Sequence, residues 1–364
     1  MKASELISYL ETLAPPSLQE SYDNSGLIVG HQNTELTGVL ISLDCTEDVV
    51  DEAIQVGCNM ILSHHPIVFS GLKRFNGKNY VERTVIKAIQ HDILLYAIHT
   101  NLDHVLDGVN GRIASQLGLV NTRILAPKKN SLQKLVTFVP VAHAENVRNA
   151  LFEAGAGAIG NYDQCSFNST GEGSFRGNDE TNAFVGEKGK LHFEPEIRIE
   201  VLLPAYSTSK IIAELKKAHP YEEVAYYLQA IENAWNEVGA GLIGELPQEV
   251  DTLDFLKGLK STMLTDCVKY TLPHKHKVKR IAVCGGSGSF LLSNAIAAKA
   301  DVFITADFKY HQFFDAENSV IIADIGHYES EQFTMQFLAD KLVDFFPKFA
   351  THLTRVKTNP VYYL

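Results

Sequence analysis

The sequence predicts an α/β protein with mostly parallel sheets from a duplicated βαβ-type unit, into which a ferredoxin-like α+β domain is inserted. Short apolar strands alternate with helices near both ends of the chain, which is typical of parallel sheets that are covered on both faces. The two end regions share one spacing of strands and helices, whereas the middle follows a different pattern. A length of 364 residues allows two or three domains.

The N-terminal part begins with a helix and continues with strands and helices in alternation. Apolar residues recur at three- and four-residue spacing from Leu6 to Leu13, and Pro15-Pro16 ends this helix. Beyond it, continuous apolar runs predict buried strands, and amphipathic stretches between them predict helices. The expected strands are 38–43, 59–63 and 93–98, and the expected helices are 46–56 and 81–90.

The C-terminal part repeats this plan. The interval from Val39 to His64 equals the interval from Ile281 to Ala306, and the apolar pattern is similar in both segments. We interpret the match as a diverged duplication of one βαβ unit, since internal repeats keep their spacing longer than their sequence. The expected strands are 280–284, 302–305 and 320–324, and the expected helices are 288–299 and 328–346.

The middle of the chain predicts an α+β domain. Strands at 134–139 and 198–203 each end at a proline and lead into a helix, and a further strand is expected at 224–230. The stretch 160–196 is rich in Gly, Asn and Ser, which favours hairpins and loops. Two βα units with hairpin strands are typical of a ferredoxin-like domain. We therefore expect residues 128–238 to be inserted into an α/β domain made of 1–127 and 239–364, with three domains in series as the alternative.

The composition excludes several classes of protein. Lys and Arg total 32 against 43 Asp and Glu, a net charge of −11, so nucleic acid is not an expected partner. No run approaches about 18 apolar residues, and the N-terminus lacks an apolar signal core, so neither a membrane span nor export is expected. The five scattered cysteines, without any C-x-x-C motif, indicate free thiols and a cytoplasmic location.

Three clusters of polar residues follow predicted strands, where open α/β sheets place their functional sites. His64 and His65 come directly after strand 59–63, and Asp103 comes shortly after strand 93–98. His327 and Glu331 are four residues apart at the start of a predicted helix, so they share one of its faces. Taken singly, each cluster is also explained by polar loop residues or by a solvated helix face.

Together, the three imidazoles and two carboxylates exceed what one catalytic zinc ion normally takes from protein. Such a set with one bridging carboxylate fits two divalent ions that polarise a bridging water. Nitrogen and oxygen ligands without thiolate suit zinc, manganese or iron, and do not choose among them. The predicted metal ligands are His64, His65, Asp103, His327 and Glu331.

Three other motifs each have two explanations. The glycine-rich turn Gly285–Ser289 either holds a phosphate on its backbone N–H groups or is only a tight turn, and it lacks the pattern of a P-loop. Asp307 and His311 are either acid/base groups or a carboxylate at a helix start and a surface histidine. The run His219–Glu223 is either a ligand-binding edge or a helix stop before a strand.

Five stretches of the chain, in order, are YDNSGL at 22–27, SHHP at 63–66, HTNLD at 99–103, GGSGS at 285–289 and GHYESE at 326–331. With these motifs the sequence resembles the Nif-three-like dinuclear-metal hexamer family, whose bacterial members are often named GTP cyclohydrolase I type 2 homologues. The middle segment looks like the inserted domain of the longer bacterial members.

The resemblance implies that the five predicted ligands hold two divalent metal ions per subunit, with Glu331 as the bridge. It implies a homohexamer in which trimers stack into a toroid. It also implies a hydrolase that opens the imidazole ring of the guanine of GTP and releases formate, with His99 or His311 carrying protons. The sequence departs from the family pattern at Tyr22, which is expected to affect only packing, and at Ala306, which is expected to affect the shape of the substrate pocket.

Two other functions stay open at this point. One is a metallo-phosphoesterase or another hydrolase that uses the same metal site on a different substrate. The other is a non-enzymatic, metal-dependent ring scaffold or regulatory protein. Acid/base groups near the metals favour an enzyme, provided that His99, Asp307 and His311 face the same cavity.

Overall fold

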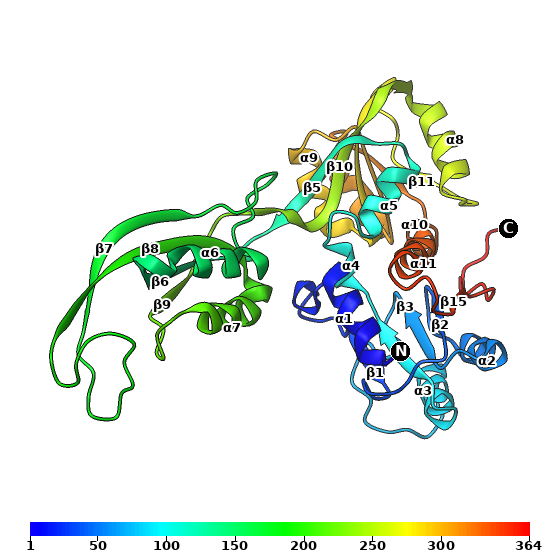
Figure 1. The fold of residues 1–364 in the computed structure, drawn as a ribbon. Coiled ribbons are helices and arrows are strands. Elements are labelled where there is room, and N and C mark those ends of the chain that lie inside the picture. Colours follow the sequence, from blue (N-terminus) through cyan, green and yellow to red (C-terminus); the bar gives the residue numbers. More distant parts are fainter. The chain divides into compact units, whose positions relative to one another are not determined.

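The computed structural model describes residues 1–364, which divide into two units (Figure 1). The first unit consists of Met1–Ala126 and Glu237–Leu364, and the second consists of Pro127–Asn236. The second unit therefore interrupts the first, because the chain leaves the first unit and later returns to it.

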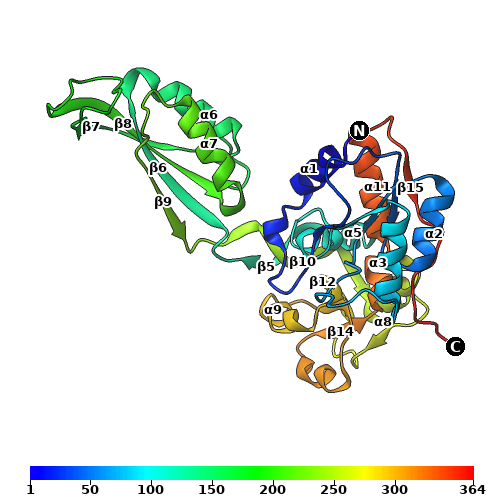
Figure 2. The same ribbon diagram turned by 90° about the horizontal axis from the view of Figure 1, so that it is seen from below.

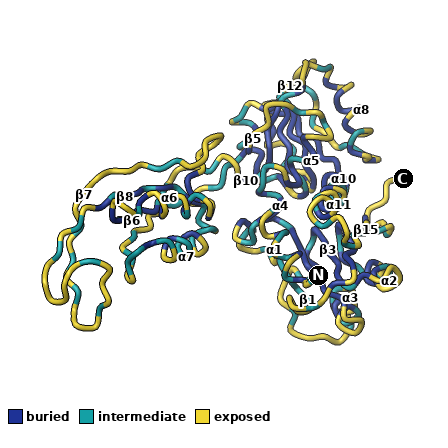
Figure 3. The backbone as a smooth tube through the Cα atoms, viewed as in Figure 1, coloured by how far each residue is buried: buried dark blue, intermediate teal, exposed yellow.

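The first sheet of the first unit has the strand order β1-β4-β3-β2-β15. Strands β2, β3, β4 and β15 are parallel, and β1 runs antiparallel at the edge. Every residue of β2, β3 and β4 is buried, which explains why these strands are continuous apolar runs in the sequence (Figure 3). The strands are β1 (Gly26–Val29), β2 (Val39–Ser42), β3 (Met60–Ser63), β4 (Leu94–Ala97) and β15 (Thr351–Leu353).

Helices cover both faces of this sheet (Figures 1 and 2). Because successive strand residues point to opposite faces, Ile41 and Leu62 pack with α1 and α11 in one apolar core. Leu40 and Ile61 point the other way and pack with α2 and α3 in a second core. The helices are α1 (Ala3–Leu13), α2 (Glu47–Val56), α3 (Tyr80–Gln90) and α11 (Phe333–Phe345).

The second sheet of this unit has the order β11-β14-β13-β12-β10-β5. Strands β12, β13 and β14 are parallel to one another, β10 runs antiparallel to β12, and β11 runs antiparallel to β14. Ile281 and Ile304 belong to the same apolar core as α1 and α11, whereas Phe303 packs with α9 on the other face. The first unit is therefore a mixed α/β structure whose two sheets share one core. The elements are β5 (Val120–Lys128), β10 (Trp235–Asp251), β11 (Lys269–Tyr270), β12 (Lys277–Ser287), β13 (Val302–Ala306), β14 (Ile321–Asp324), α5 (Val109–Gln116), α8 (Thr252–Thr262) and α9 (Leu292–Ala297).

The second unit contains one antiparallel sheet with the order β7-β8-β6-β9. One helix lies between β6 and β7 in the chain, and another between β8 and β9. Leu135, Ile199 and Val201 of the sheet pack against Val147 and Leu215 of these helices in a separate core. The elements are β6 (Leu132–Pro140), α6 (Ala144–Glu153), β7 (Phe167–Phe175), β8 (His192–Pro204), α7 (Thr208–Ala218) and β9 (Tyr226–Ile231).

The long helix expected at 328–346 is divided into α10 (His327–Glu331) and α11. The hydroxyl of Ser330 donates a hydrogen bond of 2.7 Å to the carbonyl of His327, and such bonds compete with the helical backbone ladder. No helix of the protein combines the length and the apolar character that a membrane span requires.

Candidate metal centre

The five predicted ligands lie at the ends of strands or on a short helix. His64 and His65 follow β3 directly, and Asp103 is the last residue of α4 (Thr100–Asp103), which comes after β4. Because β3 and β4 are neighbouring parallel strands, their carboxyl ends meet at the same edge of the first sheet. His327 and Glu331 are the first and last residues of α10.

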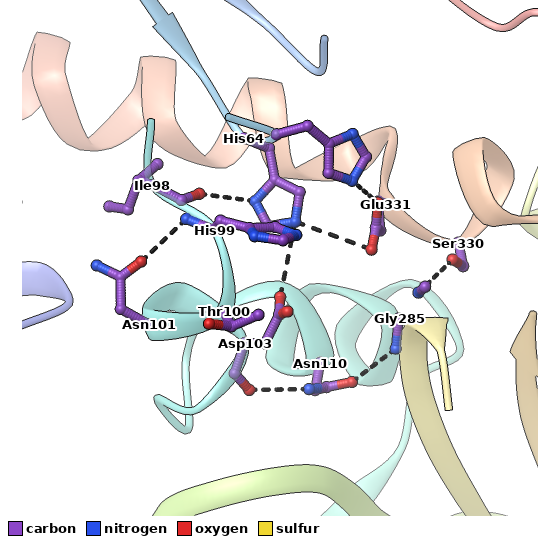
Figure 4. Close-up of polar contacts among 12 residues, drawn as sticks. His64, Ile98, His99, Thr100, Asn101, Asp103, Asn110, Gly285, Ser330 and Glu331 are labelled. Atoms are coloured by element: carbon purple, nitrogen blue, oxygen red, sulfur yellow. Dashed lines mark hydrogen bonds and ion pairs between the residues drawn. The ribbon is translucent and has the colours of Figure 1, made fainter. Parts of the chain in front are cut away.

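His64 is fully buried and is held in one orientation (Figure 4). Its Nδ1 lies 2.7 Å from the carbonyl oxygen of Ile98, which can only accept, so Nδ1 carries the proton and Nε2 carries the lone pair. This Nε2 lies 3.7 Å from Oδ1 of Asp103 and 3.8 Å from Oε1 of Glu331. The backbone therefore turns the lone pair of His64 toward both carboxylates.

His65 and His327 are oriented in the same way, but by carboxylates. Nδ1 of His65 lies 2.8 Å from Oδ1 of Asp44, and Nδ1 of His327 lies 2.6 Å from Oδ2 of Asp307. Their Nε2 atoms lie 3.0 and 3.2 Å from Oε2 of Glu331 and 3.3 Å from each other. A carboxylate that holds the outer nitrogen of an imidazole is the usual partner of a metal-binding histidine.

Two buried polar atoms of this cluster, Nε2 of His64 and Oδ1 of Asp103, have no hydrogen-bond partner, and the buried Oε2 of Glu331 is approached only by the Nε2 atoms of His65 and His327. Buried polar atoms are nearly always paired, so two unpaired atoms in one place need an explanation. Both offer lone pairs, as does Oε2 of Glu331, and a cation is the partner that would satisfy them together. The residues present therefore fit a divalent metal centre.

The charges of the site support this conclusion. Burial lowers the pKa of the His65 and His327 imidazoles, but Glu331 and the other neighbouring carboxylates raise it more, to about 10 and about 11. Burial raises the pKa of the Glu331 carboxyl, but the two imidazoles hold it well below its usual range. Burial, with the charge of Glu331, raises the pKa of Asp103 well above its usual range. The cluster thus attracts positive charge strongly.

His99 belongs to the cluster, whereas His311 does not. One ring nitrogen of His99 groups with nitrogens of His64 and His65 within 4.8 Å, and its Nδ1 lies 2.7 Å from Oδ1 of Asp23. His311 lies on the 3-10 helix Tyr310–Ala316, where it is exposed and its ring contacts other aromatic side chains of that helix. The structure therefore brings only one of the two predicted proton carriers to the ligands.

Two cavities border the imidazoles of His65 and His327. One, of about 420 Å³, is also lined by His99, Asp103 and Glu331, together with three aromatic side chains, Tyr22, Phe69 and Phe290. The other, of about 390 Å³, lies beside the carboxylate partners of the two imidazoles and is partly walled by C-terminal residues. The cluster is therefore accessible to a small molecule.

The glycine-rich turn at the end of β12 serves close packing. Gly286 has φ +61°, and a Cβ at this position would lie 2.4 Å from Oε1 of Glu331. The N–H of Gly286 donates to the hydroxyl of Ser330, and the N–H of Gly285 donates to the side chain of Asn110, both at 2.9 Å. These two N–H groups are engaged within the protein, which supports the tight turn over a phosphate cradle at this point.

Sequence reasoning did not assign roles to Asp23 and Asp44. Burial raises the pKa of the Asp23 carboxyl, but hydrogen bonds from His99 and Thr100 lower it more, to below its usual range. Asp44 follows strand β2, which neighbours β3, and this position was the available signal. Asp23 lies within one of the family-like stretches, although nothing in the sequence pairs it with an imidazole.

A model of the family described as Duf34/NIF3 (NGG1p interacting factor 3) matches residues 1–360. The chain belongs to the Duf34/NIF3 family. This confirms the family predicted from the five sequence stretches.

Other Duf34/NIF3-type proteins are similar along almost the whole chain. A relative from Halalkalibacterium halodurans is 39% identical over 339 residues, which cover 93% of this chain and 91% of the relative. A relative from Staphylococcus aureus is 36% identical over 369 residues and covers 100% of both chains. Both are named "GTP cyclohydrolase 1 type 2 homolog". A Bacillus cereus protein related to NIF3 has a similar structure, with a TM-score of 0.87, 38% identity, and coverage of 100% of this chain and 99% of that one.

The structure places Tyr22 and Ala306, the two departures from the Duf34/NIF3 pattern, contrary to what the sequence predicts. Tyr22 is 62% exposed and lines the cavity of about 420 Å³, so it borders the site instead of filling a core. Ala306 is fully buried at the end of β13 and does not line that cavity. Of the two, Tyr22 is therefore the position that can influence a bound molecule.

Proposed function

We propose that this protein is a metal-dependent hydrolase of the GTP cyclohydrolase type 2 kind, with two divalent ions per subunit held by His64, His65, Asp103, His327 and Glu331. The observation that carries the proposal is that the buried, unpartnered Nε2 of His64 and Oδ1 of Asp103 lie in one cluster with Glu331 and the imidazoles of His65 and His327. Zinc, manganese and iron all suit this set of nitrogen and oxygen ligands.

The position of Glu331 supports two ions over one. Its Oε1 faces Nε2 of His64 at 3.8 Å, and its Oε2 faces the Nε2 atoms of His65 and His327 at 3.0 and 3.2 Å. The carboxylate therefore lies between the imidazole of His64 and the imidazoles of His65 and His327, as a bridging ligand would. Bound ions would supply Lewis-acid polarisation of a substrate and of water.

His99 is the proposed proton carrier. Asp23 holds its Nδ1, which leaves the other ring nitrogen free to take or give a proton in the cavity. The nearby faces of Tyr22, Phe69 and Phe290 provide flat apolar surface for a nucleobase. A volume of about 420 Å³ lies within the usual range of small-molecule sites. The names of the relatives favour GTP as the substrate to test.

The experiment is incubation of the zinc-, manganese- or iron-loaded protein with GTP, followed by assays for formate and for a pterin chromophore. We expect both products from the wild type and from His311→Ala, a matched control away from the site, and neither from His65→Ala. Release of phosphate without formate would contradict the cyclohydrolase activity and favour a metallo-phosphoesterase. The absence of turnover with all three metals would leave a metal-dependent scaffold.

Two further properties belong to this proposal. The order β7-β8-β6-β9, with one helix after β6 and one after β8, supports a ferredoxin-like fold for the inserted segment. The family resemblance supports a cytoplasmic homohexamer of stacked trimers. Light scattering on the purified protein tests the hexamer, and a mass corresponding to a monomer would contradict it.

A further inference from the structure

The C-terminal segment Thr354–Leu364 runs from strand β15 toward the metal centre. At its start, the hydroxyl of Thr354 donates to the carboxylate of Glu52, and the N–H of Arg355 donates to the same carboxylate at 3.0 Å. Further along, Asn359, Val361 and Tyr363 wall the cavity of about 390 Å³ that borders His65 and His327. The segment is thus anchored at one end and borders the cluster with the other.

Thr358 contacts the carboxylate that orients His65. Its hydroxyl donates a hydrogen bond of 2.6 Å to Oδ2 of Asp44, while Oδ1 of Asp44 lies 2.8 Å from Nδ1 of His65. One oxygen of this carboxylate therefore accepts a hydrogen bond from the C-terminal segment, and the other contacts the imidazole. Without the hydroxyl, Asp44 could rotate away from His65.

Asn359 contacts the helix that carries the other ligands. The side chain is 5% exposed, and its Nδ2 donates a hydrogen bond of 2.9 Å to Oε1 of Glu329. Glu329 is itself buried and lies on α10 between His327 and Glu331. Its other oxygen lies 2.3 Å from where a Cβ of Gly326 would be, so the carboxylate packs closely against the start of α10.

Thr358 and Asn359 therefore contact two different parts of the protein that position metal ligands. Asp44 and His65 follow strands of the first sheet, whereas α10 follows β14 of the second sheet. We propose that Thr358 and Asn359 are positioning residues of the metal centre, which fix the first-sheet imidazole relative to α10. Neither touches the ligand atoms: Thr358 acts through Asp44, and Asn359 acts through Glu329. This inference rests on the proposed metal centre.

The test compares three volume-conserving variants of the full-length protein: Thr358→Val, Asn359→Leu and, as the matched control, Thr354→Val. Thr354 belongs to the same segment and also donates to a carboxylate, but that carboxylate, Glu52, does not contact a ligand. Zinc affinity is measured by chelator competition, and the ligand field is read from the visible spectrum of the cobalt-loaded protein.

We expect Thr358→Val and Asn359→Leu to weaken zinc binding by about tenfold and to alter the cobalt spectrum. This is the lower end of the loss that follows when the direct partner of a ligand is removed, because both residues act through a carboxylate. Thr354→Val should match the wild type in both, and Thr358→Ser, which keeps the hydroxyl, should restore both. Equal losses in Thr354→Val and Thr358→Val, or failure of the serine to restore binding, would overturn the inference. Unchanged binding in Thr358→Val and Asn359→Leu would overturn it while the metal centre stands. No zinc binding by the wild type would instead refute the proposed function.

Discussion

Metal binding to this centre should become steeply tighter as the pH rises. In the metal-free protein the pKa is about 10 at His65 and about 11 at His327, so both imidazoles are protonated near neutral pH. Their Nε2 atoms can bind a metal only after losing those protons, so occupation of the centre must displace two protons. Each displaced proton raises the apparent metal-binding constant by a factor of about ten per pH unit. For two protons, the overall binding constant of the centre should rise about 100-fold per pH unit up to about pH 9.

The assay is chelator competition at several pH values, corrected for the protonation of the chelator. Calorimetry in two buffers with different heats of ionisation counts the released protons independently. Asp103, whose pKa burial raises, adds a further proton at pH values below that pKa. His311→Ala should show the wild-type slope, because His311 lies outside the cluster. A release of fewer than one proton per chain would refute the reasoning.

Three other predictions concern single groups of the site. The raised pKa of His65 stabilises the metal-free fold fully below about pH 6.5, and this stabilisation is lost as the pH rises through about 10. Urea unfolding should therefore give a lower free energy of unfolding at pH 10 than at pH 7. Equal free energies at the two pH values would contradict this prediction. Gly286 has φ +61°, and Gly286→Ala places a Cβ against Glu331. The variant should lose about 1–3 kcal/mol of unfolding free energy and most of its bound metal. A wild-type metal content, measured by elemental analysis, would contradict close packing at this turn. Asp23→Asn should lower kcat at least about tenfold by releasing His99, with the bound metal retained; wild-type kcat would exclude His99 as the proton carrier.

The parts of the fold that the sequence predicts are those buried on both sides. Strands β2, β3 and β4 have no exposed residue, so each is an unbroken apolar run with a clear beginning and end. Strand β11 has two exposed residues, and β5 is exposed in its first half, so neither has such a run. These edge strands are defined by pairing with distant segments, which leaves no local pattern to read.

The ligands could be predicted for a related reason. They follow strand ends or lie on one helix turn, so spacing and topology bring the members of each group together. The shared core of the two sheets then brings the groups to each other. Asp23 and Asp44 could not be assigned in this way, because a hydrogen bond to Nδ1 depends on the exact course of two loops. The prediction for His311 failed for the same reason. It is only four positions after Asp307, but the 3-10 helix Tyr310–Ala316 places it among exposed aromatic side chains.

The carboxylates of the site favour two divalent ions over one. Glu331 and Asp103 lie among the ligands, and Asp23, Asp44 and Asp307 hold the outer nitrogens of three imidazoles. One ion carries the same charge as the two imidazole protons that it displaces, so its binding leaves the site as negative as before. A second ion adds net positive charge and lets Asp103 ionise, which its raised pKa otherwise opposes. We therefore expect two ions per chain in a fully loaded sample at pH 8, counted by elemental analysis; a plateau at one ion would contradict this charge balance.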